Sequence, residues 1–146
     1  MIDRSFIGLE SEDRFVDVEK GQLRLFALAT AEPNPIYVDE GEAKKAGYPA
    51  IPAPPTFAFS LASLAPAQNT STRGMNIPIA KILHGEQKFT YHKLIFAGDR
   101  IRLKTRVVDI YDKKGGALEF IVFETTSHNQ SGELCVNART VTVVRH

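Results

Sequence analysis

Cysteine is almost missing from this sequence, since Cys135 is the only one among 146 residues. One cysteine excludes a disulfide within the chain and a metal site built from several cysteines. Long hydrophobic runs are missing too. The sequence contains no stretch of about 18 apolar residues, the length needed to span a membrane. Its N-terminal segment also has no apolar core typical of a signal peptide. We therefore expect a cytoplasmic protein without a membrane partner.

An excess of charge of either sign is also lacking. Lys and Arg total 18 and Asp and Glu total 17, which gives a net charge of +1. Domains that bind nucleic acid normally have a clear basic excess, so no nucleic-acid partner is expected. The composition is 43% hydrophobic and 24% charged, as in ordinary globular proteins. The length predicts one domain, residues 1–146.

Helical signals are concentrated in the first 80 residues, which also contain every proline. Apolar spacing predicts an amphipathic helix over Glu19–Ala29 and a shorter one over Asp39–Ala46, closed by Gly47. A third helix is predicted over Thr56–Ala65. It has almost no polar face, and a helix that is apolar nearly all round is a buried one.

Four long β-prone runs make up the second half: Lys81–His92, Arg100–Asp112, Ala117–Asn129 and Glu133–Arg145. Turn residues separate them, which predicts an antiparallel meander. A slip in the alternation at Val107-Val108 predicts a β-bulge. Long strands curve, and Thr56–Ala65 is the one segment apolar enough to fill the concave face. The predicted fold is α+β, a single hot-dog domain whose curved antiparallel sheet wraps around a buried central helix, with a helical N-terminal half.

Isolated polar residues on these strands give weaker signals. The second run carries an outward row of alternating basic residues, namely Arg100, Arg102, Lys104 and Arg106. This row predicts either a solvated edge strand or a contact with the phosphates of coenzyme A or phosphopantetheine. The even spacing of His84 and His92 predicts that they share a face. With no third ligand nearby, we expect neither a metal nor a cofactor. Cys135 alternates with Leu134 and Val136 and is predicted to be inert.

Residues 30–37, Thr-Ala-Glu-Pro-Asn-Pro-Ile-Tyr, follow the first predicted helix. They resemble the hydratase-2 motif of the MaoC-like hot-dog family, Gly-Asp-x-Asn-Pro-Ile/Val-His. The segments Ala53–Phe57, His84–Phe89 and Phe96–Asp99 resemble later parts of the N-terminal MaoC-like dehydratase branch of that family, so the resemblance extends along the whole chain. It implies (R)-specific hydration of enoyl thioesters, or dehydration of 3-hydroxyacyl thioesters, in fatty-acid metabolism.

In that family a carboxylate and an imidazole on the motif loop hold the reacting water, and an amide at the start of the central helix binds the thioester oxygen. The five-residue spacing places the two side chains on one loop facing one pocket. Here Glu32 replaces the motif Asp and Tyr37 replaces the motif His, while Asn34 remains. Tyr, with an ordinary pKa of about 10, is a poor proton shuttle at neutral pH. Pro55 stands where catalytic members have Gly, and it lacks an N–H, which leaves Thr56 or later amides as donors.

With these replacements, the sequence resembles the substrate-binding, non-catalytic subunit of heterodimeric (3R)-hydroxyacyl-ACP dehydratases, in which an aromatic residue also replaces the motif His. The resemblance implies an acyl-CoA or acyl-ACP ligand and a homodimer or a heterodimer with a catalytic MaoC-like subunit. Candidate catalytic residues are Glu32, Asn34 and Tyr37, and candidate substrate-binding residues are Pro55, Thr56, Phe57 and His84.

Two other functions remain open from the sequence. One is a self-sufficient hydratase that uses Glu32 and Tyr37, or His84. The other is a thioester-binding hot-dog protein without catalysis. A hot-dog thioesterase is disfavoured, because the usual carboxylate of the central helix is missing from Thr56–Ala65.

Overall fold

The computed structural model describes residues 1–65, 75–113 and 115–146. Its helices are α1 (Lys20–Ala29), α2 (Glu40–Lys45) and α3 (Phe57–Leu64), with short 3-10 helices η1 (Arg4–Phe6), η2 (Pro35–Tyr37) and η3 (Ile79–Lys81). Its strands are β1 (Arg14–Asp17), β2 (Ile82–Tyr91), β3 (Arg100–Lys113), β4 (Leu118–His128) and β5 (Leu134–Arg145). The three predicted helices and four predicted strands are therefore present with nearly the expected bounds. Lys114, expected in a turn, lies outside the described residues.

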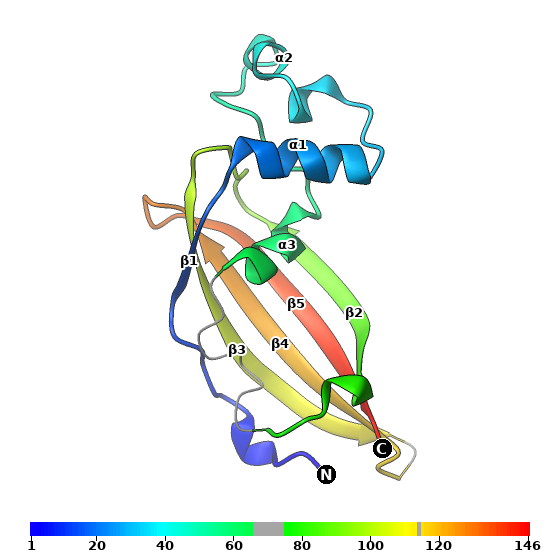
Figure 1. Cartoon of the computed structure of the whole chain (residues 1–146). Coiled ribbons are helices and arrows are strands. Elements are labelled where there is room, and N and C mark those ends of the chain that lie inside the picture. The colour runs from blue at the N-terminus through cyan, green and yellow to red at the C-terminus, as the bar shows by residue number, and fades with distance from the viewer. Residues whose placement is uncertain (66–74, 114) are drawn as a thin grey trace.

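The sheet has the strand order β1-β3-β4-β5-β2, and every pairing is antiparallel. Strands β3, β4 and β5 form the predicted meander. The prediction is wrong for β2, which pairs with β5 rather than with β3. Residues 92–99 between β2 and β3 exceed the usual hairpin loop of about 2–5 residues. They cross the end of the sheet instead, and this crossing brings them close to the start of α3 (Figure 1).

Among the described residues, the strand register shifts at three places in the long strands, one of which lies between Ser127 and His128. The register shifts between Val107 and Asp109, which confirms the predicted bulge. A second shift, between His84 and Glu86, was not predicted. There a Cβ on Gly85 would lie 2.8 Å from the Cγ2 atom of Val143, so the close approach requires glycine. Because this bulge interrupts the alternation, the inference that His84 and His92 share a face no longer follows.

The basic row on β3 does not lie on an edge strand. β1, which the sequence analysis missed, pairs with this part of β3. Three of the basic side chains form ion pairs with acidic residues on β1 or the segment preceding it: Arg100 with Asp17 at 3.7 Å, Arg102 with Asp13 at 3.2 Å and Lys104 with Glu10 at 2.8 Å. The row thus ties the N-terminal segment to β3, and the edge-strand interpretation is wrong.

Helix α3 packs in the concave face of the sheet (Figure 1). It inserts Phe57 and Leu61 into the main core, which also contains residues from β3 and β5. Its other face is open, since Phe59 is 49% exposed and Leu64 is also exposed. The prediction of a helix buried all round is therefore correct for one face only.

Helices α1 and α2 lie beyond the end of the sheet, on the side of α3 (Figure 1). α1 buries Leu23 and Ala27. Asp39 caps α2 by accepting a hydrogen bond from the Glu42 amide at 2.9 Å, and Gly47 follows the helix at φ +91°. Within the described residues, no helix is long and apolar enough to cross a membrane.

A buried carboxylate joins the two ends of the chain. Glu119 is 3% exposed; it accepts a hydrogen bond from the Ile2 amide at 2.6 Å and contacts the His146 ring. Burial raises the pKa of Glu119, but the Ile2 hydrogen bond, the His146 contact and the charge of the N-terminal amine together lower that pKa further. The net pKa lies below the ordinary value of 4.5.

We expect Glu119→Gln to lower the free energy of unfolding by about 1–3 kcal/mol at neutral pH, because hydrogen bonds to a charged group are lost. A lowered folded pKa stabilises the protein above the unfolded pKa, and this contribution disappears as the pH falls through the folded value. The difference from the wild type should therefore shrink in acid. Urea unfolding at neutral and acidic pH measures it, with exposed Glu86→Gln as the control. An equal loss at both pH values would contradict the prediction.

Candidate functional site

An apolar pocket of about 150 Å³ lies where four segments meet. η2 and residues 52–55 form two walls, and the start of α3 and residues 91–95 form the others. Pockets that enclose a whole small-molecule ligand usually measure about 300–1,000 Å³. This pocket therefore has room for one part of a larger ligand.

Three of the four tyrosines of the chain line this pocket, namely Tyr37, Tyr48 and Tyr91. Partial burial raises the pKa of Tyr37, and its electrostatic interactions with Glu32 and Tyr48 raise that pKa further. Partial burial likewise raises the pKa of Tyr91, whose hydroxyl donates a hydrogen bond to the Pro55 carbonyl at 2.8 Å. The hydroxyls of Tyr37 and Tyr91 stay neutral near pH 7, so they can form hydrogen bonds but are poor bases.

The motif loop is a compact turn stabilised by its own side chains. Ala31 has φ +53° and begins the turn. The Glu32 carboxylate accepts a hydrogen bond from the Asn34 amide at 3.0 Å, and the Asn34 side chain accepts one from the Ile36 amide at 3.2 Å. Asn34 thereby caps η2, with Pro35 at its first position. Of the three candidate catalytic residues only Tyr37 lines the pocket, so the expected convergence of both motif side chains is not seen.

The candidate substrate-binding residues are spread over three environments. Pro55 lines the pocket. Thr56 is the exposed N-cap residue of α3, just outside the pocket lining. Phe57 is buried in the main core, with its ring edge-on to Phe26 at 5.4 Å between centroids. His84 lies on β2, edge-on to Phe59 at 5.3 Å, away from the pocket. The structure thus brings together Tyr37 and Pro55 but not His84.

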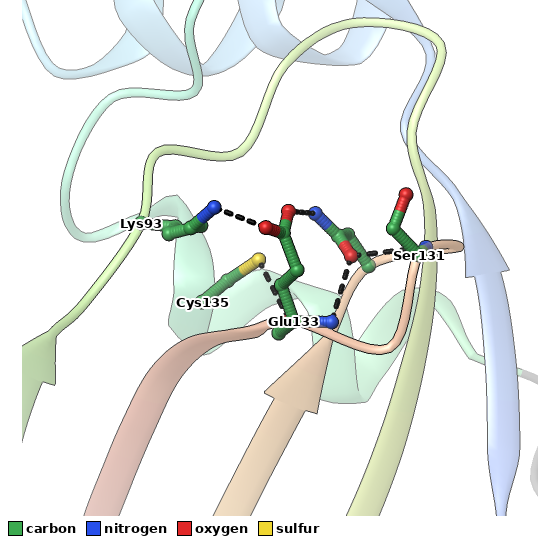
Figure 2. Close-up of polar contacts among 5 residues, drawn as sticks. Lys93, Ser131, Glu133 and Cys135 are labelled. Atoms are coloured by element: carbon green, nitrogen blue, oxygen red, sulfur yellow. Dashed lines mark hydrogen bonds and ion pairs between the residues drawn. The ribbon is translucent and has the colours of Figure 1, made fainter.

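Sequence analysis missed the wall formed by residues 91–95, which includes Lys93. Figure 2 shows the Lys93 ammonium directed at the Glu133 carboxylate, with which it forms an ion pair. The other carboxylate oxygen of Glu133 accepts a hydrogen bond from the Asn129 side chain at 2.9 Å. Cys135 is buried beside this pair. No sequence motif indicated that residues 91–95 line the pocket, because they come close to the motif loop only where residues 92–99 cross the end of the sheet.

Comparison with known proteins agrees with the architecture. A family model described as FAS1-like, dehydratase domain region, matches residues 5–138. A UPF0336 protein of Streptomyces avermitilis is 33% identical over 146 residues, covering 99% of this chain and 95% of the relative.

Two solved structures are similar over nearly the whole chain. The C-terminally truncated HadBC (3R-hydroxyacyl-ACP dehydratase) complex of Mycobacterium tuberculosis has a TM-score of 0.79 at 28% identity, covering 94% of this chain and 96% of that chain. A MaoC-like dehydratase has a TM-score of 0.84 at 22% identity, covering 97% of this chain and 42% of that one. The predicted hot-dog fold and the similarity to MaoC-like dehydratases are confirmed.

Proposed function

Because this chain belongs to the family described as FAS1-like, dehydratase domain region, we propose that it is the acyl-binding subunit of a 3-hydroxyacyl-thioester dehydratase or (R)-specific enoyl hydratase. Its ligand is an acyl-CoA or acyl-ACP thioester, and a partner hot-dog subunit supplies the acid–base pair. The pocket beside Tyr37 and Pro55 holds the thioester end of the ligand. The description of the similar HadBC structure as a (3R)-hydroxyacyl-ACP dehydratase complex supports this assignment.

The observation that carries the proposal is the chemistry of the pocket lining. Adding water to an enoyl thioester requires a base for the water and an acid for the α-carbon. Tyr37 stands in the pocket with a raised pKa, and Glu32 is hydrogen-bonded within its own loop. Lys93, the only Lys, Arg, Asp or Glu among the described residues that line this pocket, is paired with Glu133. This lining suits binding of a neutral acyl group better than proton transfer.

A partner has an accessible place to dock. β2 forms one end of the strand order, so within the described part of the chain no strand pairs with the outer edge of this ten-residue strand. Exposed apolar side chains lie nearby, including Leu83 on β2 and Phe59 on α3. Proteins usually cover long edge strands of this kind. We assign this edge and the open face of α3 to the second hot-dog subunit.

Purified alone, the chain should hydrate an enoyl-CoA at least about 10²-fold more slowly than when mixed with a MaoC-like subunit that has an intact Gly-Asp-x-Asn-Pro-x-His motif, because general acid–base catalysis contributes roughly 10²–10⁴-fold. Loss of enoyl-thioester absorbance measures the rate, and sedimentation velocity measures association. The matched control is the same partner with its motif His replaced by Ala.

Rapid hydration by the isolated chain would contradict the proposal. If that activity were lost in Glu32→Gln or Tyr37→Phe, the self-sufficient hydratase would be the correct function. Acyl-thioester binding without any added activity in the mixture would instead identify a non-catalytic binding protein.

A further inference from the structure

A positive charge at the rim of the apolar pocket is neutralised by a neighbouring carboxylate. Lys93 lines the pocket, and its ammonium is paired with the Glu133 carboxylate. Both side chains are about half exposed, at 51% and 43%. The pair therefore lies at the solvent-exposed rim of the pocket.

Glu133 is held firmly in the charged state. The Lys93 contact and the Asn129 hydrogen bond lower the pKa of Glu133 below its ordinary value. The Asn129 side chain also accepts hydrogen bonds from the amides of Ser131 and Glu133, each at 3.0 Å, so the β4–β5 turn presents this carboxylate to Lys93 (Figure 2).

This charge balance decides which ligand atoms the rim accepts. A lysine ammonium has three N–H donors, and one partner oxygen leaves donors free for a second acceptor. A neutral carbonyl oxygen can take such a donor without disturbing Glu133. A ligand carboxylate would be placed next to Glu133, and the repulsion between like charges would offset its attraction to Lys93.

We propose that the Lys93–Glu133 pair makes the pocket selective for an uncharged acyl thioester over the corresponding free fatty acid. Lys93 donates a hydrogen bond to the thioester oxygen, and Glu133 repels the carboxylate that hydrolysis of the thioester would produce. This inference rests on the proposed function, because it concerns the ligand of the same pocket. It assigns the selection to two residues outside the motif loop.

The test compares two probes that share an acyl chain, the uncharged thioester S-hexanoyl-N-acetylcysteamine and hexanoate. Calorimetry should show that the wild type prefers the thioester. Glu133→Gln keeps the size of the side chain and an acceptor for Asn129, so it should raise the affinity for hexanoate roughly five- to tenfold and leave the thioester affinity within about twofold. Lys93→Met removes the donor and should lower the thioester affinity roughly fivefold.

Glu124→Gln is the matched control. Glu124 forms an ion pair with Arg139 at 3.2 Å, and these side chains are 41% and 47% exposed, much like the pair at the pocket. Neither residue lines the pocket, so this variant should leave both affinities unchanged. Thermal unfolding of each variant shows whether it is folded, and Lys93→Met remains a test if Glu133→Gln is unstable.

The outcomes distinguish a failure of the proposed function from a failure of the selectivity inference. If the wild type binds neither probe, the proposed function fails. If the wild type binds both equally, or if Glu133→Gln gains no affinity for hexanoate, the selectivity inference fails while the acyl-binding function stands. If Lys93→Met keeps the wild-type affinity for the thioester, Lys93 does not donate a hydrogen bond to the ligand and the inference also fails.

Discussion

The double variant Glu32→Asp, Tyr37→His is expected to turn the isolated chain into a weak but measurable enoyl-thioester hydratase. The change restores the Asp and His of the motif while Asn34 and Pro35 already form the turn that carries them. His has an ordinary pKa of about 6.5 and exchanges protons near neutral pH, whereas the pKa of Tyr37 is raised above its ordinary value of 10. The smaller imidazole also leaves space for the reacting water. Each single variant should be less active than the pair.

Adding Pro55→Gly should increase the rate further, by up to roughly 10²–10³-fold, the usual contribution of one oxyanion donor. Helix α3 begins at Phe57 with Thr56 as its N-cap, so residue 55 lies before the helix and can be changed without breaking it. The residue 55 carbonyl, which accepts the Tyr91 hydrogen bond, is retained in glycine. Productive geometry has to hold within about 0.5 Å, so a rate equal to that of natural hydratases is not expected.

Initial rates of enoyl-CoA hydration measure this series. Tyr111→His, outside the pocket, controls for an effect of an added imidazole elsewhere. If the triple variant is folded, binds the acyl thioester and shows no rate above background, the motif has been placed on the wrong residues. The search would then move to His84 on β2.

Phe57→Ala should lower the free energy of unfolding by about 3–5 kcal/mol, because it leaves a cavity in the main core. Phe57 is 2% exposed, and its ring packs edge-on against Phe26, which belongs to α1. The substitution therefore removes packing between α1 and α3 as well as buried apolar area. Urea denaturation at several protein concentrations gives the value and separates folding from association.

The control is Phe59→Ala, two residues later on the same helix. Phe59 is 49% exposed, so its loss should cost less than about 1.5 kcal/mol in the isolated chain. A similar large cost for both variants would show that the open face of α3 is covered in solution. That result would favour a homodimer through this face and would change the interpretation of the isolated-chain measurements.

The strands β2 to β5 could be predicted because each is long and combines alternating or continuously apolar runs with clear turn residues. The bulge at Val107 was visible for the same reason, as a slip in a regular pattern. β1 was not predicted, because a strand of four residues is too short to show a clear alternation of apolar and polar residues. The pairing of β2 with β5 was not predicted either. It depends on the path of residues 92–99, and no local sequence pattern encodes this path.

The candidate site divides in the same way. The motif loop was recognisable because the contiguous residues 30–37 resemble the hydratase-2 motif, and a contiguous motif can be compared without knowledge of the fold. The side of the pocket that contains Tyr91 and Lys93 was not, because these residues lie more than fifty positions along the chain from the loop. Phe57 was a candidate to bind substrate, and only the packing showed that it lies in the core while Tyr37 lines the pocket.

By itself the sequence determined the secondary structure and the hot-dog class, since these follow from periodicity and turn chemistry at short range, and its resemblance to the MaoC-like family indicated the degenerate motif. Tertiary structure decided the strand order, the open face of α3 and the pairing of Lys93 with Glu133 at the pocket. These features depend on contacts between distant segments. Their energies arise from burial and charge in three dimensions, which a linear pattern does not contain.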